Sequence, residues 1–251
     1  MPTITAFMYP WASVEKCVVA SKIITLFTII DDFTEERNQE DEAKMLIQRI
    51  IEIIENNETV KFSSKFWFEA AMSDVWQEFQ GAPVSWREDF KSTITTLMMA
   101  FFEETKQSNV PTFDEYFTLR LITVGIQLPQ MMIEFAAEKY LSNSQRSNLA
   151  FQANQATANY IIMTMNDIFS FSREVKTKFN LIILFMKHEK LDEKDARNKL
   201  IEYMKRNIQL YLKQREMLSL YPKSTEWYLK YVDQLVRGAF DFHKTVPRYK
   251  L

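Results

Sequence analysis

Hydrophobic residues recur with helical spacing along nearly the whole chain, and this pattern predicts an all-helical protein. In residues 41–56, for example, Leu46, Ile50 and Ile53 fall on one face of a helix, while charged residues fall on the other. The same spacing predicts further helices at about residues 11–30, 64–80, 144–178, 192–220 and 224–243. We see no repeat or linker in this series, so we predict one all-α domain that spans residues 1–251.

Short motifs predict where two more helices begin and where one of them breaks. The segments "SWRE" from Ser85 and "TFDE" from Thr112 both fit a capping box, in which a hydroxyl and a carboxylate close the first turn. The helix that follows Thr112 contains Gly125 and Pro129. We therefore predict a break or kink at residues 124–129.

Three oxygen-bearing side chains, Asn166, Ser170 and Glu174, follow the apolar segment "ANYIIMTM" at intervals of four residues. A helix advances about 100° per residue, so a step of four residues brings the chain round with about 40° of drift. The three side chains therefore form one stripe and can converge on a single point, as the ligands of a hard cation must. A polar helix face is the alternative interpretation.

A second set of oxygen ligands lies in the motif "DDFTEE", where Asp31, Asp32 and Glu35 end a very apolar predicted helix. Such carboxylates suit Mg²⁺, which often binds through one or two of them together with phosphate oxygens. A solvated acidic loop is the alternative.

Arg120 lies among apolar residues just before the predicted break. A buried arginine is costly unless it is paired, so Arg120 alone indicates a structural salt bridge. Acidic groups and arginines together in one helical bundle indicate metal ions and a polyanion such as diphosphate, because arginine donors match phosphate geometry.

Composition narrows the functional classes without adding a site. The chain has only 3 glycines in 251 residues, which favours helices over sheets, and its formal charge of -2 gives no reason to expect a nucleic-acid partner. No apolar run is long enough to span a membrane. Cys17 is the only cysteine, which rules out an internal disulfide and fits a reducing compartment. We see no targeting signal and therefore expect the cytoplasm. His188 and His243 lie among lysines, and we expect both to be exposed and assign them no chemistry.

Four motifs, in the same order along the chain, resemble those of class I terpene synthases, most closely the microbial and social-amoeba type. The family motif D-D-x-x-D/E corresponds to residues 31–35. The motif N-D/S-x-x-S-x-x-R/K-E is matched by Asn166, Asp167, Ser170, Arg173 and Glu174. Arg120 lies where that family has a diphosphate-sensing arginine, and the terminal pair of the family corresponds to Arg248 and Tyr249.

This resemblance implies the helical bundle of the class I terpene synthases and a lyase of isoprenoid biosynthesis. Such an enzyme ionises a prenyl diphosphate, releases diphosphate and converts the carbocation to a cyclic or linear terpene. Farnesyl diphosphate is the favoured substrate, which would make the product a sesquiterpene.

The resemblance also implies three Mg²⁺ ions, with Mn²⁺ as an alternative metal. Two ions would be held by Asp31, Asp32 and Glu35, and the third by Asn166, Ser170 and Glu174. The diphosphate would be bound by Arg120, Arg173, Arg248 and Tyr249. The family's linker and effector positions, which follow its sensing arginine, would be Thr123 and Val124.

A carbocation needs a dry pocket in which aromatic faces can stabilise positive charge. Phe27 is the first candidate, because it lies one turn before Asp31 on the same predicted helix. Further candidates are Trp67, Trp76 and Phe242.

Two features depart from the family pattern. The aspartate-rich motif begins at residue 31, whereas in most members two further helices precede it, so we expect a shortened N-terminus. A homodimer would cover apolar surface that those helices would otherwise cover. Phe242 stands where most members have a tryptophan.

Two other interpretations stay open. A chain-elongating prenyl transferase shares the fold and the metals, but that family has a second aspartate-rich motif where this chain has Asn166, Ser170 and Glu174. A non-catalytic or weakly active helical relative of the synthases is the other, although the ligands of every motif are intact.

Overall fold

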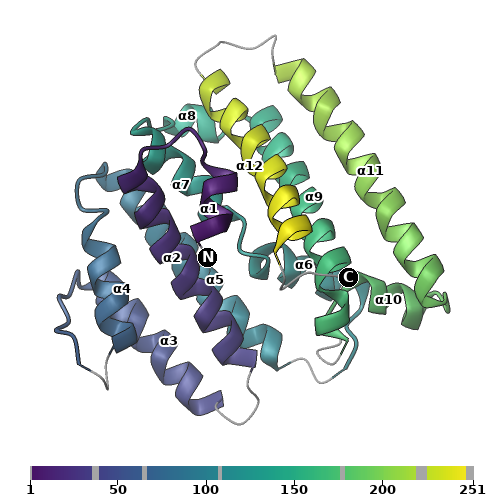
Figure 1. Ribbon diagram of the computed structural model, residues 1–251, viewed down its shortest axis with the longest axis horizontal. Helices are drawn as coiled ribbons and strands as arrows, with labels where there is room; N and C mark the ends of the chain where they lie inside the picture. The colour runs from purple at the N-terminus through teal and green to yellow at the C-terminus, as the bar shows by residue number, and fades with distance from the viewer. Residues whose placement is uncertain are drawn as a thin grey trace. The chain divides into compact units, whose positions relative to one another are not determined.

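The computed structural model describes residues 2–35, 40–63, 67–106, 109–175, 179–218 and 225–246, and all regular structure in them is helical (Figure 1). The prediction of an all-α protein is confirmed. In chain order the helices are α1 (Pro2–Met8), α2 (Val14–Glu35), α3 (Glu40–Glu55), α4 (Trp67–Gln77), α5 (Val84–Thr105), α6 (Phe113–Thr123), α7 (Gln127–Ala137), α8 (Asn143–Arg146), α9 (Leu149–Glu174), α10 (Leu181–His188), α11 (Glu193–Leu218) and α12 (Glu226–Thr245). Within the described ranges, no helix is both long and apolar enough to cross a membrane.

The contacts between residues divide the chain into two compact units. Unit 1 comprises Met1–Ala6, Pro10–Lys106 and Gln127–Tyr140, and unit 2 comprises Phe7–Tyr9, Gln107–Ile126 and Leu141–Leu251. Unit 1 therefore contains α2, α3, α4, α5 and α7, and unit 2 contains α6 and α8 to α12. The prediction that residues 1–251 form one domain stays a prediction.

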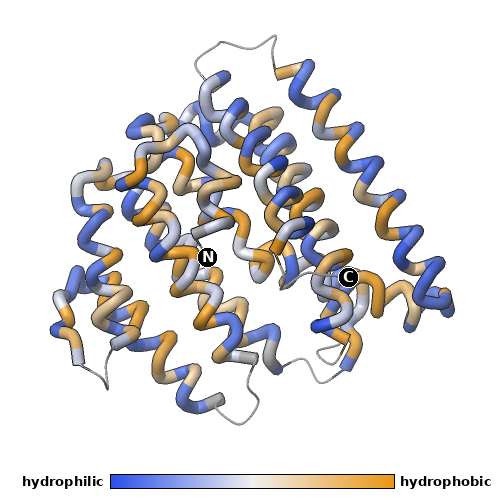
Figure 2. The backbone as a smooth tube through the Cα atoms, in the orientation of Figure 1, coloured by the Kyte–Doolittle hydropathy of each residue, from blue (hydrophilic) through white to orange (hydrophobic). Residues whose placement is uncertain are grey.

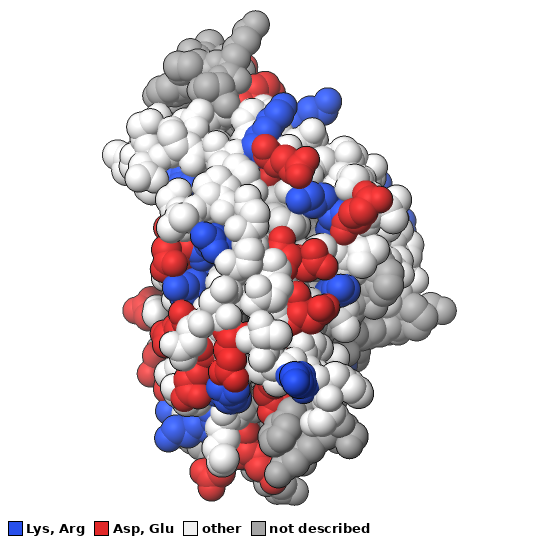
Figure 3. Space-filling model, turned by 90° about the vertical axis from the view of Figure 1, so that its left-hand side faces the viewer, with Lys and Arg blue, Asp and Glu red and all other residues white. Residues whose placement is uncertain are grey.

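In unit 1, α2 packs against α3, α4, α5 and α7. Many of its apolar residues are buried, including Ile23 and Ile30, which are 0% exposed. An aromatic cluster lies at one part of this core, where the ring of Phe79 is 4.8 Å from that of Phe135 and 5.0 Å from that of Phe90. On the face of the molecule seen in Figure 3, acidic and basic side chains are interleaved.

In unit 2, the long helix α9 is central and contacts α6, α8, α10, α11 and α12. Figure 2 shows hydrophilic and hydrophobic residues alternating along α11, as expected of a helix with one buried face. The side chains of α11 that are buried are Ala196, Leu200, Tyr211 and Leu218.

Helix α12 is held by contacts along its length. Asp233 accepts a hydrogen bond from Tyr211 of α11 at 2.5 Å and forms a salt bridge with Arg215 at 3.0 Å. Further along, Gly238 lies so close to the backbone of Phe7 that an added Cβ would be 2.3 Å from the Phe7 carbonyl oxygen. A side chain at this position would push α12 away from residues 7–9.

The predicted helix ends are partly confirmed. Thr112 caps α6 with the capping box that the sequence predicts, and Gly125, at φ 68°, forms the predicted break between α6 and α7. The capping box at Ser85 is wrong, because α5 begins directly after Pro83, two residues earlier than the motif requires. Proline fixes the extended entry to the helix, and its carbonyl accepts from the Arg87 amide at 3.0 Å.

Other boundaries differ from the sequence pattern. The helix expected at 144–178 is divided, because Asn148 caps a new helix and separates α8 from α9. Helix α2 continues to Glu35, so Asp31 and Asp32 lie in its last turns. The short helices α1 and α10 are not predicted by the hydrophobic pattern.

Candidate functional site

The polar stripe of α9 lies where helical geometry predicts. Ser170 is 1% exposed and Glu174 7% exposed, while Asn166 is half-buried. The Ser170 hydroxyl donates to Asn166 Oδ1 at 3.5 Å. One nitrogen of the Arg120 guanidinium lies 2.7 Å from Asn166 Oδ1 and 3.4 Å from Glu174 Oε1. The amide and carboxylate oxygens therefore face one positively charged group.

Arg120, near the end of α6, is buried and paired, as its apolar surroundings require. Its Nε and one terminal nitrogen donate to Asp167 Oδ1 at 3.1 and 2.9 Å. These contacts with the Asp167 carboxylate fix the plane of the guanidinium. The terminal nitrogen that donates to Asp167 also contacts Asn166 and Glu174 of the stripe. The structural salt bridge that the sequence indicates for Arg120 alone is present, and Arg120 also contacts the stripe.

Asp167 is the centre of this cluster, a position that the sequence motif does not reveal. Its carboxylate is 0% exposed and also accepts from the Tyr116 hydroxyl and, at 2.7 Å, from the Leu181 backbone amide. Tyr116 and Arg120 are four residues apart on α6, so both project toward α9. The signal available in the sequence was this pair of polar residues, four apart, among the apolar residues of α6.

Asn180, just before α10, joins the two ends of the motif. Its Nδ2 donates to the Asp167 backbone carbonyl at 2.9 Å and to Glu174 Oε2 at 2.8 Å, while its Oδ1 caps α10 at the Ile182 amide. Asn180 is not among the site residues predicted from the sequence. Because both polar atoms of its side chain have partners, its burial at 0% exposure is tolerated.

Burial shapes the protonation of the cluster. It raises the pKa of Tyr116 well above its usual value, so the hydroxyl keeps its proton and donates to Asp167. Burial also raises the pKa of the Asp167 carboxyl, although the Arg120 guanidinium acts in the opposite direction. The Tyr116–Asp167 hydrogen bond thus has a fixed donor.

The prediction that His243 is exposed is wrong. This residue of α12 is 5% exposed, and burial lowers its pKa, so the ring is neutral at neutral pH. Its Nδ1 is 2.7 Å from the Ala239 carbonyl oxygen, and its Nε2 is 3.2 Å from Asn166 Nδ2. His188 is exposed, as predicted, and contacts the Pro111 carbonyl.

The aspartate-rich motif belongs to unit 1. Asp31 is half-buried and Asp32 exposed, and the Thr34 hydroxyl donates to the Asp31 carbonyl at 2.9 Å. The side chain of Glu35 lies outside the described part of the structure, as do residues 248 and 249 with the predicted Arg248 and Tyr249. Arg173 is exposed on α9.

The predicted pocket aromatics differ in burial. Phe27 is 6% exposed, Trp76 and Phe242 are each 3% exposed, and Trp67 is 46% exposed. At the predicted linker position, Thr123 is buried, and its hydroxyl has no hydrogen-bond partner among the described residues. Val124 caps α6 with its amide on the Arg120 carbonyl. The roles of these residues stay predictions.

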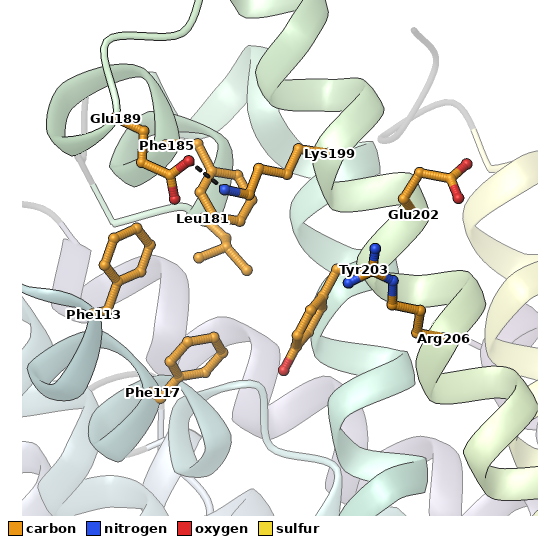
Figure 4. A pocket seen from close by; sticks show the side chains of 9 residues that line it. All are labelled: Phe113, Phe117, Leu181, Phe185, Glu189, Lys199, Glu202, Tyr203 and Arg206. Atoms are coloured by element: carbon orange, nitrogen blue, oxygen red, sulfur yellow. Dashed lines mark hydrogen bonds and ion pairs between the residues drawn. The ribbon is translucent and has the colours of Figure 1, made fainter.

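A hollow of about 310 Å³ lies beside the cluster, between α6, α10 and α11 (Figure 4). Its described lining comprises Phe113, Phe117, Leu181, Phe185, Glu189, Lys199, Glu202, Tyr203 and Arg206, none of which is a predicted site residue. Lys199 pairs with Glu189 at the edge of the hollow. Leu181 connects the two regions, because its side chain lines the hollow while its amide donates to Asp167.

The ligand chemistry of the α9 stripe fits a hard divalent cation. The Asn166 amide oxygen and the Glu174 carboxylate face the same guanidinium, and the Ser170 hydroxyl donates to that amide oxygen. Hard cations prefer oxygen ligands of this kind. Among the described residues, no group of three or more His, Cys, Asp or Glu side chains is arranged to hold a metal. A metal here would therefore use Asn166 and Ser170 as well as Glu174.

Comparisons with known proteins agree on one family. Residues 22–209 match the family described as "Terpene synthase family 2, C-terminal metal binding". The chain is 23% identical over 259 aligned residues to germacrene A synthase of Nostoc punctiforme, covering 98% of this chain and 80% of that protein. Terpene synthase 9 of Dictyostelium discoideum is 21% identical over 183 residues, which cover 70% of this chain and 54% of the relative.

Solved structures share the fold at low sequence identity. Linalool/nerolidol synthase from Streptomyces clavuligerus has a TM-score of 0.85 and 15% identity, over 95% of this chain and 85% of its own. The 2-methylisoborneol synthase of Streptomyces coelicolor, in complex with Mg²⁺ and 2-fluoroneryl diphosphate, has a TM-score of 0.84 and 18% identity, over 99% and 82%.

Proposed function

Because the chain belongs to terpene synthase family 2, we propose that it is a Mg²⁺-dependent terpene synthase that converts a prenyl diphosphate to a cyclic or linear terpene. The favoured substrate is farnesyl diphosphate, with release of diphosphate. Membership of a metal-binding terpene synthase domain implies a divalent metal and a prenyl diphosphate substrate. Beyond what the family implies, we propose that the metal is Mg²⁺, that three ions bind, and that the substrate has the chain length of farnesyl diphosphate.

The observation that carries the proposal is the buried cluster around Arg120. A guanidinium held by Asp167 also contacts the oxygens of Asn166 and Glu174. The proposed diphosphate-binding cation therefore lies next to the proposed metal-ligating oxygens. This adjacency is what metal-assisted departure of diphosphate requires, because the negative charge develops where metal and arginine meet.

We assign the residues of the chain the following roles. Asn166, Ser170 and Glu174 hold one ion, and Asp31, Asp32 and Glu35 hold two. The side chains that bind diphosphate oxygens are Arg120, Arg173, Arg248 and Tyr249. When bound, Mg²⁺ supplies positive charge that stabilises the departing diphosphate. Asp167 and Tyr116 keep the guanidinium of Arg120 in position without touching the substrate.

The hydrocarbon chain needs an apolar enclosure, for which we propose Phe27, Trp76 and Phe242, with Trp67 as a fourth candidate. The low exposure of the first three supports this assignment. Aromatic faces stabilise a passing cation by about 0.5–2 kcal/mol each, so no single ring decides whether ionisation occurs.

The test is incubation with geranyl, farnesyl and geranylgeranyl diphosphates and Mg²⁺, followed by gas chromatography–mass spectrometry and a diphosphate assay. We expect a terpene, chiefly from farnesyl diphosphate, together with released diphosphate. An elongated prenyl diphosphate would indicate a prenyl transferase, and no turnover of any of the three substrates would indicate a non-catalytic relative.

A matched pair of serine variants connects this activity to the α9 stripe. Ser170→Ala removes a proposed ligand and should lower turnover by at least about tenfold. Ser172→Ala makes the same change on an exposed position of α9 and should leave turnover unchanged. Equal effects from the two variants would contradict the proposed ligand set.

A further inference from the structure

The ring of His243 has a defined hydrogen-bond arrangement. Its Nδ1 faces the Ala239 carbonyl oxygen at 2.7 Å, and a carbonyl oxygen can only accept. Nδ1 must therefore carry the hydrogen. Nε2 lies 3.2 Å from Asn166 Nδ2, which can only donate, so Nε2 accepts and has a lone pair.

This arrangement distinguishes the two ends of the Asn166 amide. Nδ2 donates to His243, and Oδ1 accepts from Arg120 at 2.7 Å and from Ser170 at 3.5 Å. A flipped amide would set Nδ2 against the N–H groups of Arg120 and Oδ1 against the Nε2 lone pair. Both contacts would then be repulsive, so Arg120 and the histidine tautomer together determine which way the amide points.

The position of the histidine ring is itself fixed. Its centroid lies 5.7 Å from that of Phe169 on α9 and 5.7 Å from that of Phe242. Helix α12 is in turn held against residues 7–9 at Gly238 and against α11 at Asp233. The ring therefore has little freedom to turn away from Asn166.

We propose that His243 is a positioning residue, whose Nε2 lone pair holds the Asn166 amide with Oδ1 turned toward Arg120 and Ser170. His243 touches neither metal nor substrate in this assignment, and it acts through Asn166. The consequence for metal binding rests on the proposed function, because it requires Asn166 Oδ1 to be a metal ligand. The hydrogen-bond arrangement does not depend on that function.

The first test reads the tautomer directly. The chain has only 2 histidines, so ¹⁵N spectra of protein with labelled histidine rings contain two ring systems, and His188→Gln assigns them. At neutral pH we expect the buried ring to be neutral with its hydrogen on Nδ1. Hydrogen on Nε2, or on both nitrogens, would overturn the proposal.

The second test uses two amide replacements that keep different halves of the ring. The longer side chain of His243→Gln can bring an oxygen to the Nε2 position, whereas the shorter one of His243→Asn reaches only the Nδ1 position. We expect His243→Asn to weaken Mn²⁺ binding by about tenfold or more, and His243→Gln to stay within about threefold of wild type. Electron paramagnetic resonance measures Mn²⁺ binding without substrate, and thermal unfolding checks that each variant is folded.

Turnover at increasing metal concentration separates positioning from a general structural defect. Excess Mg²⁺ should restore much of the rate of His243→Asn, because the deficit lies in a metal ligand. The control, His188→Asn, makes the same change at the exposed histidine and should leave both Mn²⁺ binding and rate unchanged. Wild-type Mn²⁺ affinity in a folded His243→Asn variant would overturn the proposal.

Failure of the positioning role can be distinguished from failure of the proposed function. If wild-type protein turns over no prenyl diphosphate, the proposed function fails, and the tautomer spectrum still decides whether His243 orients Asn166. If turnover is normal but hydrogen lies on Nε2, the positioning role fails and the proposed function stands.

Discussion

The two predicted metal motifs use the same kind of oxygen ligand in very different surroundings. In unit 1, Asp32 is exposed and Asp31 half-buried at the end of α2. In unit 2, Ser170 and Glu174 are almost wholly buried, and Asp167 beside them accepts hydrogen bonds from both α6 and the start of α10. A change in the α9 motif should therefore alter the fold and the chemistry, whereas a change at Asp32 should alter the chemistry alone.

Removal of metal should have the largest effect, and it should not distinguish the motifs. Excess EDTA should lower turnover by at least about 10³-fold, which corresponds to several kcal/mol of lost charge stabilisation. Readdition of Mg²⁺ should restore the rate. Diphosphate release measured before and after chelation is the assay, and undiminished turnover in EDTA would mean that neither motif binds a required metal.

The same substitution in each motif tests the comparison itself. Asp167→Asn removes one of the two carboxylates that pair with the buried Arg120, the other being Glu174, and should lower the free energy of unfolding by roughly 3–5 kcal/mol. Asp32→Asn, at an exposed position, should change it by less than about 0.5 kcal/mol while still lowering turnover. Urea unfolding of both variants gives the measurement. Similar losses of stability in the two variants would contradict the proposed difference between the buried motif of α9 and the exposed end of α2.

The close contact of α12 in unit 2 gives a smaller effect. Gly238→Ala would set a Cβ 2.3 Å from the Phe7 carbonyl oxygen, and such overpacking typically costs about 1–3 kcal/mol. Because α12 carries His243, the variant should also weaken Mn²⁺ binding. Gly81→Ala in unit 1 is the control, since no atom lies within 4 Å of its added Cβ. Thermal unfolding that ranks the two alanine variants equally would be inconsistent with this contact.

The smallest effect concerns products rather than rate. Phe27 precedes Asp31 by one turn of α2, and we propose that its ring stabilises a carbocation by about 0.5–2 kcal/mol. Phe27→Leu should leave diphosphate release largely intact and shift the products toward linear terpenes. Phe90→Leu, in the aromatic cluster with Phe79, makes the same change and should keep the product ratio. An unchanged product ratio in Phe27→Leu would show that the Phe27 ring is an ordinary core residue and does not contact the carbocation.

Periodicity and motif spacing predict much of the unit 2 site. The interval of four residues correctly groups Asn166, Ser170 and Glu174, and the apolar surroundings of Arg120 correctly indicate a paired, buried arginine. The stripe depends on the geometry of a single helix, and the pairing of Arg120 depends on the cost of burying one charged side chain. Both can be predicted without knowing which helices pack together.

The remaining contacts depend on tertiary packing that local patterns do not contain. His243 follows Leu235 and Ala239 on the buried face of α12, but the adjacent Lys244 suggests an exposed helix end. Asn180 resembles an ordinary cap, and only the packing of α10 against α9 brings its amide to Glu174. At Ser85 the predicted capping box does not form, because Pro83, two residues earlier, is the N-cap of α5.

The Leu181 amide offers a natural reporter on unit 2. As the first residue of α10, it has no partner within the helix, and such amides commonly exchange their hydrogen rapidly with solvent. Here the amide donates to the buried Asp167 carboxylate at 2.7 Å. Its deuterium uptake should therefore be as slow as that of core amides. Accelerated uptake at this one position would then report that α6, α9 and α10 have separated, before any loss of helix content becomes visible.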